Sequence, residues 1–252
     1  MRNLIILLIF LKILVGYAFA QVNQSKITQG DAICIESNSI PDHKVGKFPN
    51  RANPNTIREQ RIKLCVSSNP KKNSKPQFIK GTIGIALNGI QFRPNTAGSY
   101  DPSSKSGHSR NGDKRWTLDI FGAKNRLGLD MNNGHVGPNG LYHYHGIAES
   151  LIGNSASSFI GYAGDGFEIH FVGRKVRSGY TLRSGERPSG PRGAYDGTFN
   201  EDYIYSNDHE ALDQCNGGQL NGKYVYFVTL DYPFIGRCLW GDIAPGFGAD
   251  RH

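Results

Sequence analysis

The chain has 252 residues, of which 29 are basic and 21 acidic, so its formal net charge is +8. A chain of this length can bury a core as one large or two small domains. Glycine contributes 32 residues, nearly twice the usual share of about 7%, and strong helix formers rarely run together. These features exclude a coiled coil, a solenoid and a multi-span membrane protein, and they predict a mainly β fold of short strands.

The N-terminus has the pattern of a secretory signal peptide. Arg2 precedes an apolar run over 4–15, and an A-x-A pattern follows at 18–20. This order predicts cleavage after Ala20 and a secreted, periplasmic or extracellular protein. An uncleaved anchor is the alternative, but Lys12 interrupts a run that is already short for a span of about 20 residues. We therefore expect no stable membrane span after cleavage.

The predicted mature chain keeps a moderate basic excess. Residues 1–20 hold two basic and no acidic side chains, so cleavage leaves a formal net charge of +6. The densest basic segment, 70–76, contains no aromatic residue, so we expect no nucleic-acid partner. Anionic glycans or cell-envelope polymers suit a basic exported protein better. The sequence does not set the oligomeric state.

Four cysteines predict two disulfides. They are widely spaced, which fits an oxidising compartment and does not fit a C-x-x-C metal knuckle. Three pairings are possible. We favour Cys34 with Cys65 and Cys215 with Cys238, because the members of each pair are neighbours in the sequence and fall in a separate segment.

An internal repeat spans residues 81–241. Four blocks recur in the same order: 83–90 with 160–167, 129–134 with 212–217, 139–145 with 221–227, and 151–153 with 234–236. We therefore predict two structurally equivalent halves, 81–155 and 158–241. Residues 21–80, with strands expected at 32–36 and 61–67, are predicted to form an N-terminal β segment packed on the repeat as an extra sheet edge, and an independent domain is the alternative. Residues 242–252 form a C-terminal tail.

Turn dipeptides indicate how each half folds. Asn-Gly or Asp-Gly pairs lie at 88–89, 139–140, 165–166 and 221–222, and such pairs favour two-residue hairpins in which both residues take positive φ. Four hairpins predict an internally duplicated antiparallel β-sandwich or sheet assembly with long Gly/Pro-rich loops. Short helices are expected only at 149–152 and 209–212. The Gly/Pro-rich stretch 182–202 is a loop, either ordered or mobile.

The two halves differ in one motif. The sequence YHYH at 142–145 aligns with YVYF at 224–227. Residues i and i+2 of a strand share a face, so His143 and His145 point together, and the two tyrosines share the opposite face. Such a pair can converge on one metal ion at about 2.0–2.1 Å from each nitrogen. A structural pair of hydrogen-bonded histidines is the alternative.

Other histidines extend this candidate site. His135 lies on the loop leading into the same strand, where turn glycines allow it to fold back as a third ligand. His43, in the N-terminal segment, is a fourth candidate. His170 is a weaker candidate, because strand alternation makes it a packed residue. We expect the remaining three to be structural or incidental: His108, His209 and His252.

Carboxylates and tyrosines near the motif have expected supporting roles. Asp130 and Asp165 have counterparts in the other half, which argues first for turn and capping roles. Asp130 or Glu149 is alternatively a metal ligand, or the acceptor that fixes an imidazole tautomer. Tyr142 and Tyr144 are expected to pack on the opposite sheet face. No nucleophile elbow, phosphate loop or dinucleotide fingerprint is present.

With these residues in view, the chain resembles the secreted family named for its YHYH motif, here within Gly140–Gly146. The resemblance covers nearly all of the predicted mature chain, through blocks at 40–43, 48–51, 53–55, 83–89, 160–167, 194–199, 212–217 and 233–238. It is specific for membership and not for function. Two departures, His170 in place of a tyrosine-like position and YVYF in the second half, leave the histidines of the first half untouched.

The sequence thus predicts an exported protein that binds Zn or Cu through His143, His145 and His135, with His43 as a further candidate. Neutral imidazoles suit Zn or Cu(II), whereas Cu(I) sites favour methionine, and Met131 alone follows the signal peptide. If the site is catalytic, an open metal position would activate water to hydrolyse an envelope or extracellular polymer. The alternative is a non-enzymatic glycan- or protein-binding module with structural histidines.

Overall fold

The computed structural model describes residues 22–152 and 158–248. The predicted signal peptide lies outside the described residues, as do 153–155 of the first half and the end of the C-terminal tail with His252. Among the residues that the structure describes, no helix has both the length and the apolar character to span a bilayer.

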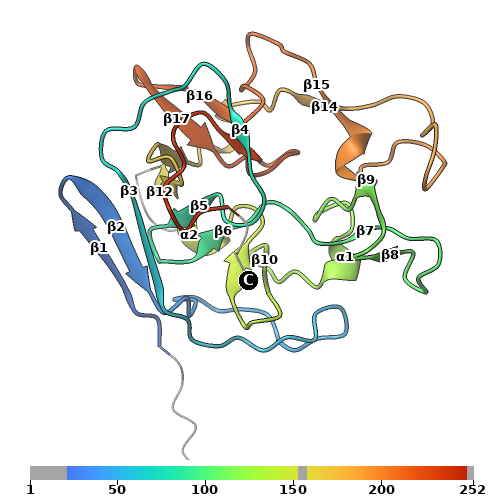
Figure 1. Cartoon of the computed structure of the whole chain (residues 1–252), viewed down its shortest axis with the longest axis horizontal. Helices are drawn as coiled ribbons and strands as arrows, with labels where there is room; N and C mark the ends of the chain where they lie inside the picture. The colour runs from blue at the N-terminus through green and yellow to red at the C-terminus, as the bar shows by residue number, and fades with distance from the viewer. Residues whose placement is uncertain (1–21, 153–157, 249–252) are drawn as a thin grey trace, which may run out of the picture.

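The described chain is mainly β, as predicted (Figure 1). Its short strands are β1 Ser25–Gln29, β2 Ala32–Ser37, β3 Ile62–Ser67, β4 Gln77–Phe78, β5 Gly84–Ala86, β6 Gln91–Phe92, β7 Ser99–Tyr100, β8 His108–Ser109, β9 Asp113–Thr117, β10 Gly134–Val136, β11 Tyr142–Tyr144, β12 Phe159–Ala163, β13 Glu168–His170, β14 Tyr180–Leu182, β15 Tyr203–Tyr205, β16 Gly217–Leu220, β17 Lys223–Phe227 and β18 Cys238–Leu239. The helices are α1 Lys124–Leu127 and α2 Glu149–Ile152, with 3-10 turns η1 Gly173–Lys175 and η2 Asn200–Asp202. Helix α2 matches its predicted position, whereas α1 was not foreseen and 209–212 forms only a turn.

The central sheet has eight strands in the order β10-β11-β6-β5-β12-β13-β17-β16. Strands β5 and β12 pair antiparallel at its centre. On either side the same pairings follow: an antiparallel hairpin, a parallel pair and a second antiparallel hairpin. The two parallel pairs, β6–β11 and β13–β17, depart from the antiparallel prediction. Each pair joins strands of different hairpins, so a long crossover replaces the short turn that antiparallel neighbours allow.

Matching hydrogen bonds recur in the two outer hairpins. The hydroxyl of Tyr142 donates to the carboxylate of Asp130 at 2.8 Å, and Tyr224 donates to Asp213 at 2.7 Å. The same carboxylates accept the backbone N–H of the glycine that opens each outer strand. A Cβ on Gly134 would lie 2.3 Å from the Tyr142 hydroxyl, so the tyrosine ring requires glycine there. These bonds fix the start of the strand that carries His135.

The four predicted hairpins are present, but their turns differ. Asn221 and Gly222 both have positive φ, of 50° and 78°, which is the expected two-residue turn. In the other three only the glycine does, with φ of 81°, 87° and 93° at residues 89, 140 and 166. In each of these turns the N–H of the glycine donates to the carbonyl of the residue three positions earlier. This is the pattern of a longer hairpin loop that ends in one left-handed residue.

The N-terminal segment forms a sheet of its own. Strands β1, β2 and β3 pair antiparallel, at the left edge of Figure 1. The predicted strands at 32–36 and 61–67 are therefore present, but they are not an edge of the central sheet. Ile35 and Leu64 pack against Ile85 and Tyr162, which attaches this sheet to the central one.

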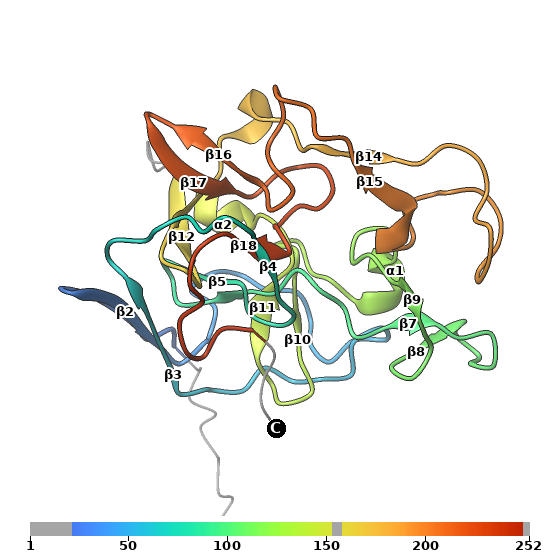
Figure 2. The same ribbon diagram turned by 45° about the horizontal axis from the view of Figure 1, so that its top comes forward.

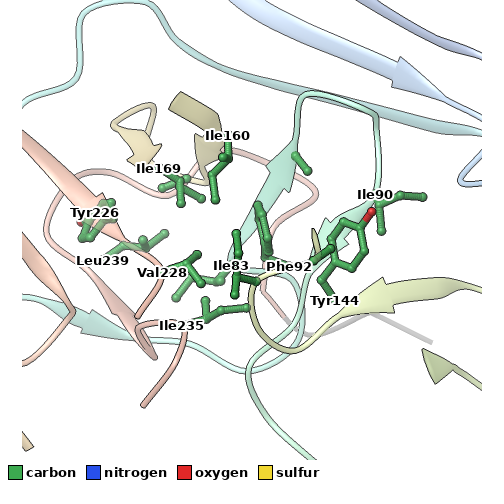
Figure 3. Packing of buried hydrophobic residues seen from close by; sticks show 14 of the residues in the cluster. Ile83, Ile90, Phe92, Tyr144, Ile160, Ile169, Tyr226, Val228, Ile235 and Leu239 are labelled. Carbon is green, nitrogen blue, oxygen red and sulfur yellow. The ribbon is translucent and has the colours of Figure 1, made fainter. Parts of the chain in front are cut away.

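The main core lies along the central sheet (Figure 3). Ile83 and Phe92 lie between Tyr144 on one side and residues of the second half, such as Val228, on the other. Cys215 and Cys238 lie in the same cluster and form a disulfide, and Cys34 and Cys65 form the other across β2 and β3. Both pairings are those favoured from the sequence.

Two long insertions pack together beside the core, on the right of Figure 2. They follow β6 and β13, and they share a small core around Trp116, Leu118 and Phe199. The Gly/Pro-rich loop 182–202 is held by a buried ion pair, because the Arg187 guanidinium binds Asp202 at 2.6 and 2.7 Å. Both residues of this pair belong to the loop. The Asp119 N–H donates to the Thr198 carbonyl at 2.9 Å, which attaches the loop to the other insertion.

Candidate metal centre

Three histidines converge from one antiparallel hairpin. In the β10–β11 register His135 lies opposite His143, and His145 follows directly after β11. Strand alternation therefore places His143 and His145 on one face, as predicted from the sequence. His135 joins them from the neighbouring strand, because residues directly opposite in such a pair project to the same side.

The three imidazole rings form a nearly equilateral triangle. Their centroids are 4.8 Å apart for His135 and His143, 4.6 Å for His135 and His145, and 4.8 Å for His143 and His145. One potential ligand nitrogen from each ring lies within 4.8 Å of the others. The Nε2 atoms of His135 and His145 are 3.1 Å apart. Two ligands of a tetrahedral zinc ion at 2.0–2.1 Å would lie about 3.3 Å apart, so this spacing fits a shared ion.

Backbone carbonyls set the tautomers of two rings. His135 Nδ1 lies 3.0 Å from the carbonyl oxygen of Leu127, and His143 Nδ1 lies 3.1 Å from that of Leu141. A carbonyl oxygen only accepts, so both Nδ1 atoms carry the proton and both Nε2 atoms keep a lone pair. Metal-binding histidines are oriented in this way in proteins.

Burial keeps the three imidazoles neutral. His143 and His145 are 6% and 1% exposed, and His135 is half-buried. Desolvation lowers the pKa of His135 and places those of His143 and His145 well below the usual range, and mutual repulsion within the cluster lowers the latter two further. Each ring is therefore neutral at neutral pH, with one proton and one free lone pair, which is the form that binds metals.

A pocket of about 600 Å³ opens on this cluster. His135 and His143 form part of its lining, whereas His145 is buried and does not line it. Residues 52–55, 95–98 and 108–110 also line it. A metal ion held by the three rings would therefore face a space large enough for a further ligand.

Comparison with known proteins places this hairpin in a family. The family model described as "YHYH protein" matches residues 63–241. The chain belongs to the YHYH family. No curated protein and no solved structure matches it. In this YHYH protein the motif of the family name supplies two of the three converging histidines and the two tyrosines on the other face of β11.

His43 lies on the tyrosine face of β11 and not in the histidine cluster. Its Nε2 is 2.7 Å from the Tyr144 hydroxyl, and its ring stacks on that of Tyr144 at 5.8 Å between centroids. The amide of Asn132 contacts His43 Nδ1 at 3.1 Å and donates to the Lys44 carbonyl at 2.8 Å. The structure thus gives this predicted ligand a packing position, which sequence distance alone could not reveal.

The predicted supporting residues also lie away from the imidazoles. Asp130 holds Tyr142 and the turn before His135. In the second half, Asp165 accepts the hydroxyl of Tyr226 at 2.7 Å. Glu149 is exposed at the start of α2. Tyr142 is fully buried, as a packing residue should be. The acceptors that orient the rings are backbone carbonyls, which a sequence does not reveal.

The other described histidines are separate from the cluster. His170 bridges Ser158 at 2.9 Å and Glu168 at 2.7 Å, as a packed strand residue. His108 lines the pocket at a distance from the hairpin, with its Nδ1 on the carbonyl of Ser106. Neither joins the group of three that is suited to a metal ion.

Arg93 is the residue that sequence reasoning missed. It follows β6 and lines the pocket together with His135 and His143. Its positive charge contributes to the lowered pKa of all three cluster histidines. Its position depends on the parallel pairing of β6 with β11, and the local sequence contains no signal for that pairing.

Proposed function

We propose that His135, His143 and His145 bind a transition metal ion, Zn or Cu(II), through their Nε2 atoms. The observation that carries this proposal is the triangle of neutral rings, two of which have Nδ1 already committed to a carbonyl. Nitrogen donors without sulfur favour these two ions. All four cysteines are in disulfides, so no thiolate competes for the role.

We further propose that the metal ion is catalytic. Three protein ligands plus one open position is the arrangement of catalytic zinc, in which the pKa of bound water falls to about 7. The pocket beside His135 and His143 supplies room for a substrate at that position. The reaction that fits is hydrolysis of an extracellular or envelope polymer by metal-bound water.

We also propose that the protein is exported and that its two halves arose by duplication. Two disulfides support an oxidising compartment, in agreement with the signal pattern at 1–20. The same order of strand pairings on each side of β5 and β12, together with the equivalent Tyr–Asp hydrogen bonds, supports an origin of the two halves by duplication. On this view the second half retained the scaffold, and the first half carries the chemistry.

Elemental analysis tests the metal site. The protein is exported without a His tag, loaded with Zn or Cu(II) and freed of excess metal. We expect about one ion per chain, and none in His143→Ala/His145→Ala. His43→Gln is the matched control and should keep the ion, because His43 lies on the other face of β11. A folded wild type that takes up neither ion would overturn the proposal.

Two further measurements separate the catalytic site from its alternative. A hydrolase loses turnover of polymer or of a chromogenic ester when the metal is removed and regains it on reloading. A glycan- or protein-binding module would instead stay bound to its insoluble partner in the presence of a chelator. Retention of that kind, with no metal-dependent hydrolysis, would reject the catalytic proposal.

A further inference from the structure

The pocket beside the histidine cluster contains an imidazole that the proposed metal site does not use. His108, on β8, lines the pocket together with His135 and His143. It belongs to one of the two insertions beside the core (Figure 2), and it lies outside the group of three histidines suited to a metal ion. A substrate that fills this space of about 600 Å³ would therefore contact His108 as well as the cluster.

His108 has the same tautomer as the cluster histidine of β11. Its Nδ1 lies 3.0 Å from the carbonyl oxygen of Ser106, two residues earlier, just as His143 Nδ1 lies 3.1 Å from that of Leu141. A carbonyl oxygen only accepts, so Nδ1 carries the proton and Nε2 keeps a lone pair. Among the residues that the structure describes, none forms a hydrogen bond with His108 Nε2. That lone pair is therefore available to a bound molecule.

Backbone contacts hold the segment that carries this ring. Strand β8 pairs with β7, and the N–H of Asp101 donates to the carbonyl of Gly107 at 3.0 Å, which closes the loop before His108. The Ser106 hydroxyl donates to the His108 carbonyl at 2.9 Å. A Cβ on Gly98 would lie 3.5 Å from His108 Cδ2, so the ring packs close to the backbone there. The imidazole is thus positioned before any substrate binds.

His108 is the group of the lining best suited to exchange a proton near neutral pH. Apart from the two cluster histidines, the other described lining side chains are apolar, amide, hydroxyl or guanidinium groups, and arginine stays protonated in proteins. Asp101 accepts the hydroxyl of Ser109 at 2.6 Å but does not line the pocket. Hydrogen bonds from Ser103 and Ser109 also hold the pKa of Asp101 below its usual range, which makes it a weaker base.

We propose that His108 is the proton-transfer residue of the hydrolysis and that the bond it helps to cleave is an ester. Its Nε2 accepts a proton from the attacking water as the new carbon–oxygen bond forms. It returns that proton to the leaving oxygen as the ester bond breaks, so one water is consumed, an acid and an alcohol are released, and the ring ends neutral. Imidazole suits this role because it gains and loses a proton near neutral pH. The inference rests on the proposed hydrolytic function.

The tautomer of His108 can be measured without metal or substrate. Long-range ¹H–¹⁵N NMR spectra of the metal-free protein distinguish a protonated ring nitrogen from one with a lone pair, and His108→Gln identifies the signals. We expect the proton on Nδ1 and the lone pair on Nε2, at a pH where the ring is neutral. A proton on Nε2 would overturn the inference, because that atom could then not accept one from water.

A pair of esters with different leaving groups tests the proton transfer. The Zn-loaded protein is assayed on ethyl acetate and on 4-nitrophenyl acetate. His108→Gln should lower kcat for the ethyl ester about 100-fold or more. The loss on the nitrophenyl ester should be smaller, because 4-nitrophenolate leaves without taking up a proton. His209→Gln is the matched control, since His209 is exposed and does not line the pocket, and it should change neither rate.

Equal losses on the two esters, or an unchanged kcat, would overturn the inference. A merely structural role would lower both rates by the same factor. His108→Gln should also unfold at the temperature of the wild type and keep about one Zn per chain. Loss of the ion would show that His108 is a ligand, which contradicts the proposed role.

The wild type separates this inference from the function on which it rests. A Zn-loaded wild type that hydrolyses neither ester nor polymer would overturn the catalytic proposal, and this inference with it. A wild type that hydrolyses the esters, and whose relative rates on them are unchanged in His108→Gln, would overturn the role of His108 alone.

Discussion

The two halves of the central sheet have the same order of strand pairings and differ on one face of their motif strands. On one face of β11 and β17, tyrosines hold equivalent aspartates, with Tyr142 on Asp130 and Tyr224 on Asp213. On the other face, the first half carries its histidine cluster. The second half carries Gly218, Val225 and Phe227 at the same register positions.

Under the proposed function, this difference distinguishes a supporting half of the sheet from the half that binds the metal ion. Val225 and Phe227 are each 2% exposed and pack with Leu212 in a closed apolar cluster. The corresponding face of the first half is polar and opens on a pocket. A fold that already tolerates apolar residues at these positions does not need histidine there for stability. This comparison supports the proposal that the histidines bind a ligand.

Replacing the three histidines by the residues at the same register positions of the second half should have the largest effect, which is on metal binding. His135→Gly/His143→Val/His145→Phe recreates the apolar set of the second half. We expect stoichiometric metal binding to vanish, which elemental analysis measures, while the metal-free variant unfolds at or above the temperature of the metal-free wild type. A variant that still binds one ion would break the proposed division between the halves.

The reverse transplant should destabilise the protein. Val225→His/Phe227→His places two imidazoles in the apolar cluster around Leu212, far from the pocket. We expect a loss of about 3 kcal/mol or more in the free energy of unfolding, from lost packing and unpaired polar atoms. Urea denaturation measures it. A stable variant that binds a second metal ion would contradict the assignment of chemistry to one half alone.

The histidine face should also make stability depend on pH. Burial lowers the pKa of His135, His143 and His145 in the folded state, so between those values and about 6.5 the unfolded chain binds more protons. The free energy of unfolding of the metal-free protein therefore falls as pH drops below about 6.5, by up to about 1.4 kcal/mol per pH unit for each histidine. Denaturation at several pH values measures the slope. The variant His135→Gly/His143→Val/His145→Phe should show a smaller change of unfolding free energy with pH. Equal slopes in the variant and the wild type would show that the three histidines do not cause the pH dependence.

The tyrosine face should respond alike in both halves, with the smallest effect. Tyr142→Phe and Tyr224→Phe each remove one hydroxyl bond to an aspartate. We expect each to lower the free energy of unfolding by about 1–2 kcal/mol, with metal content unchanged. Loss of the ion in Tyr142→Phe alone would show that the tyrosine face takes part in the site.

The sequence predicted the elements that depend on local pattern. Strand alternation was enough to bring His143 and His145 to one face, and turn dipeptides located the four hairpins. It was less informative wherever distant segments meet. His43 is as plausible a ligand as His135 by residue type, but the path of residues 38–61 brings it to the tyrosine face. Arg93 enters the pocket through a parallel strand pairing that no short motif encodes.

The turns before the outer strands are fastened in different ways. Cys215 and Asn132 occupy the same position in the aligned sequence blocks 212–217 and 129–134. Cys215 is bonded covalently to Cys238, whereas the amide of Asn132 forms hydrogen bonds to His43 and Lys44. A covalent link restricts local opening more than hydrogen bonds do. Amide hydrogens of residues 130–134 should therefore exchange with solvent faster than those of 213–217. The turn before the proposed metal-binding strand can therefore open without breaking a disulfide, whereas the corresponding turn of the second half cannot.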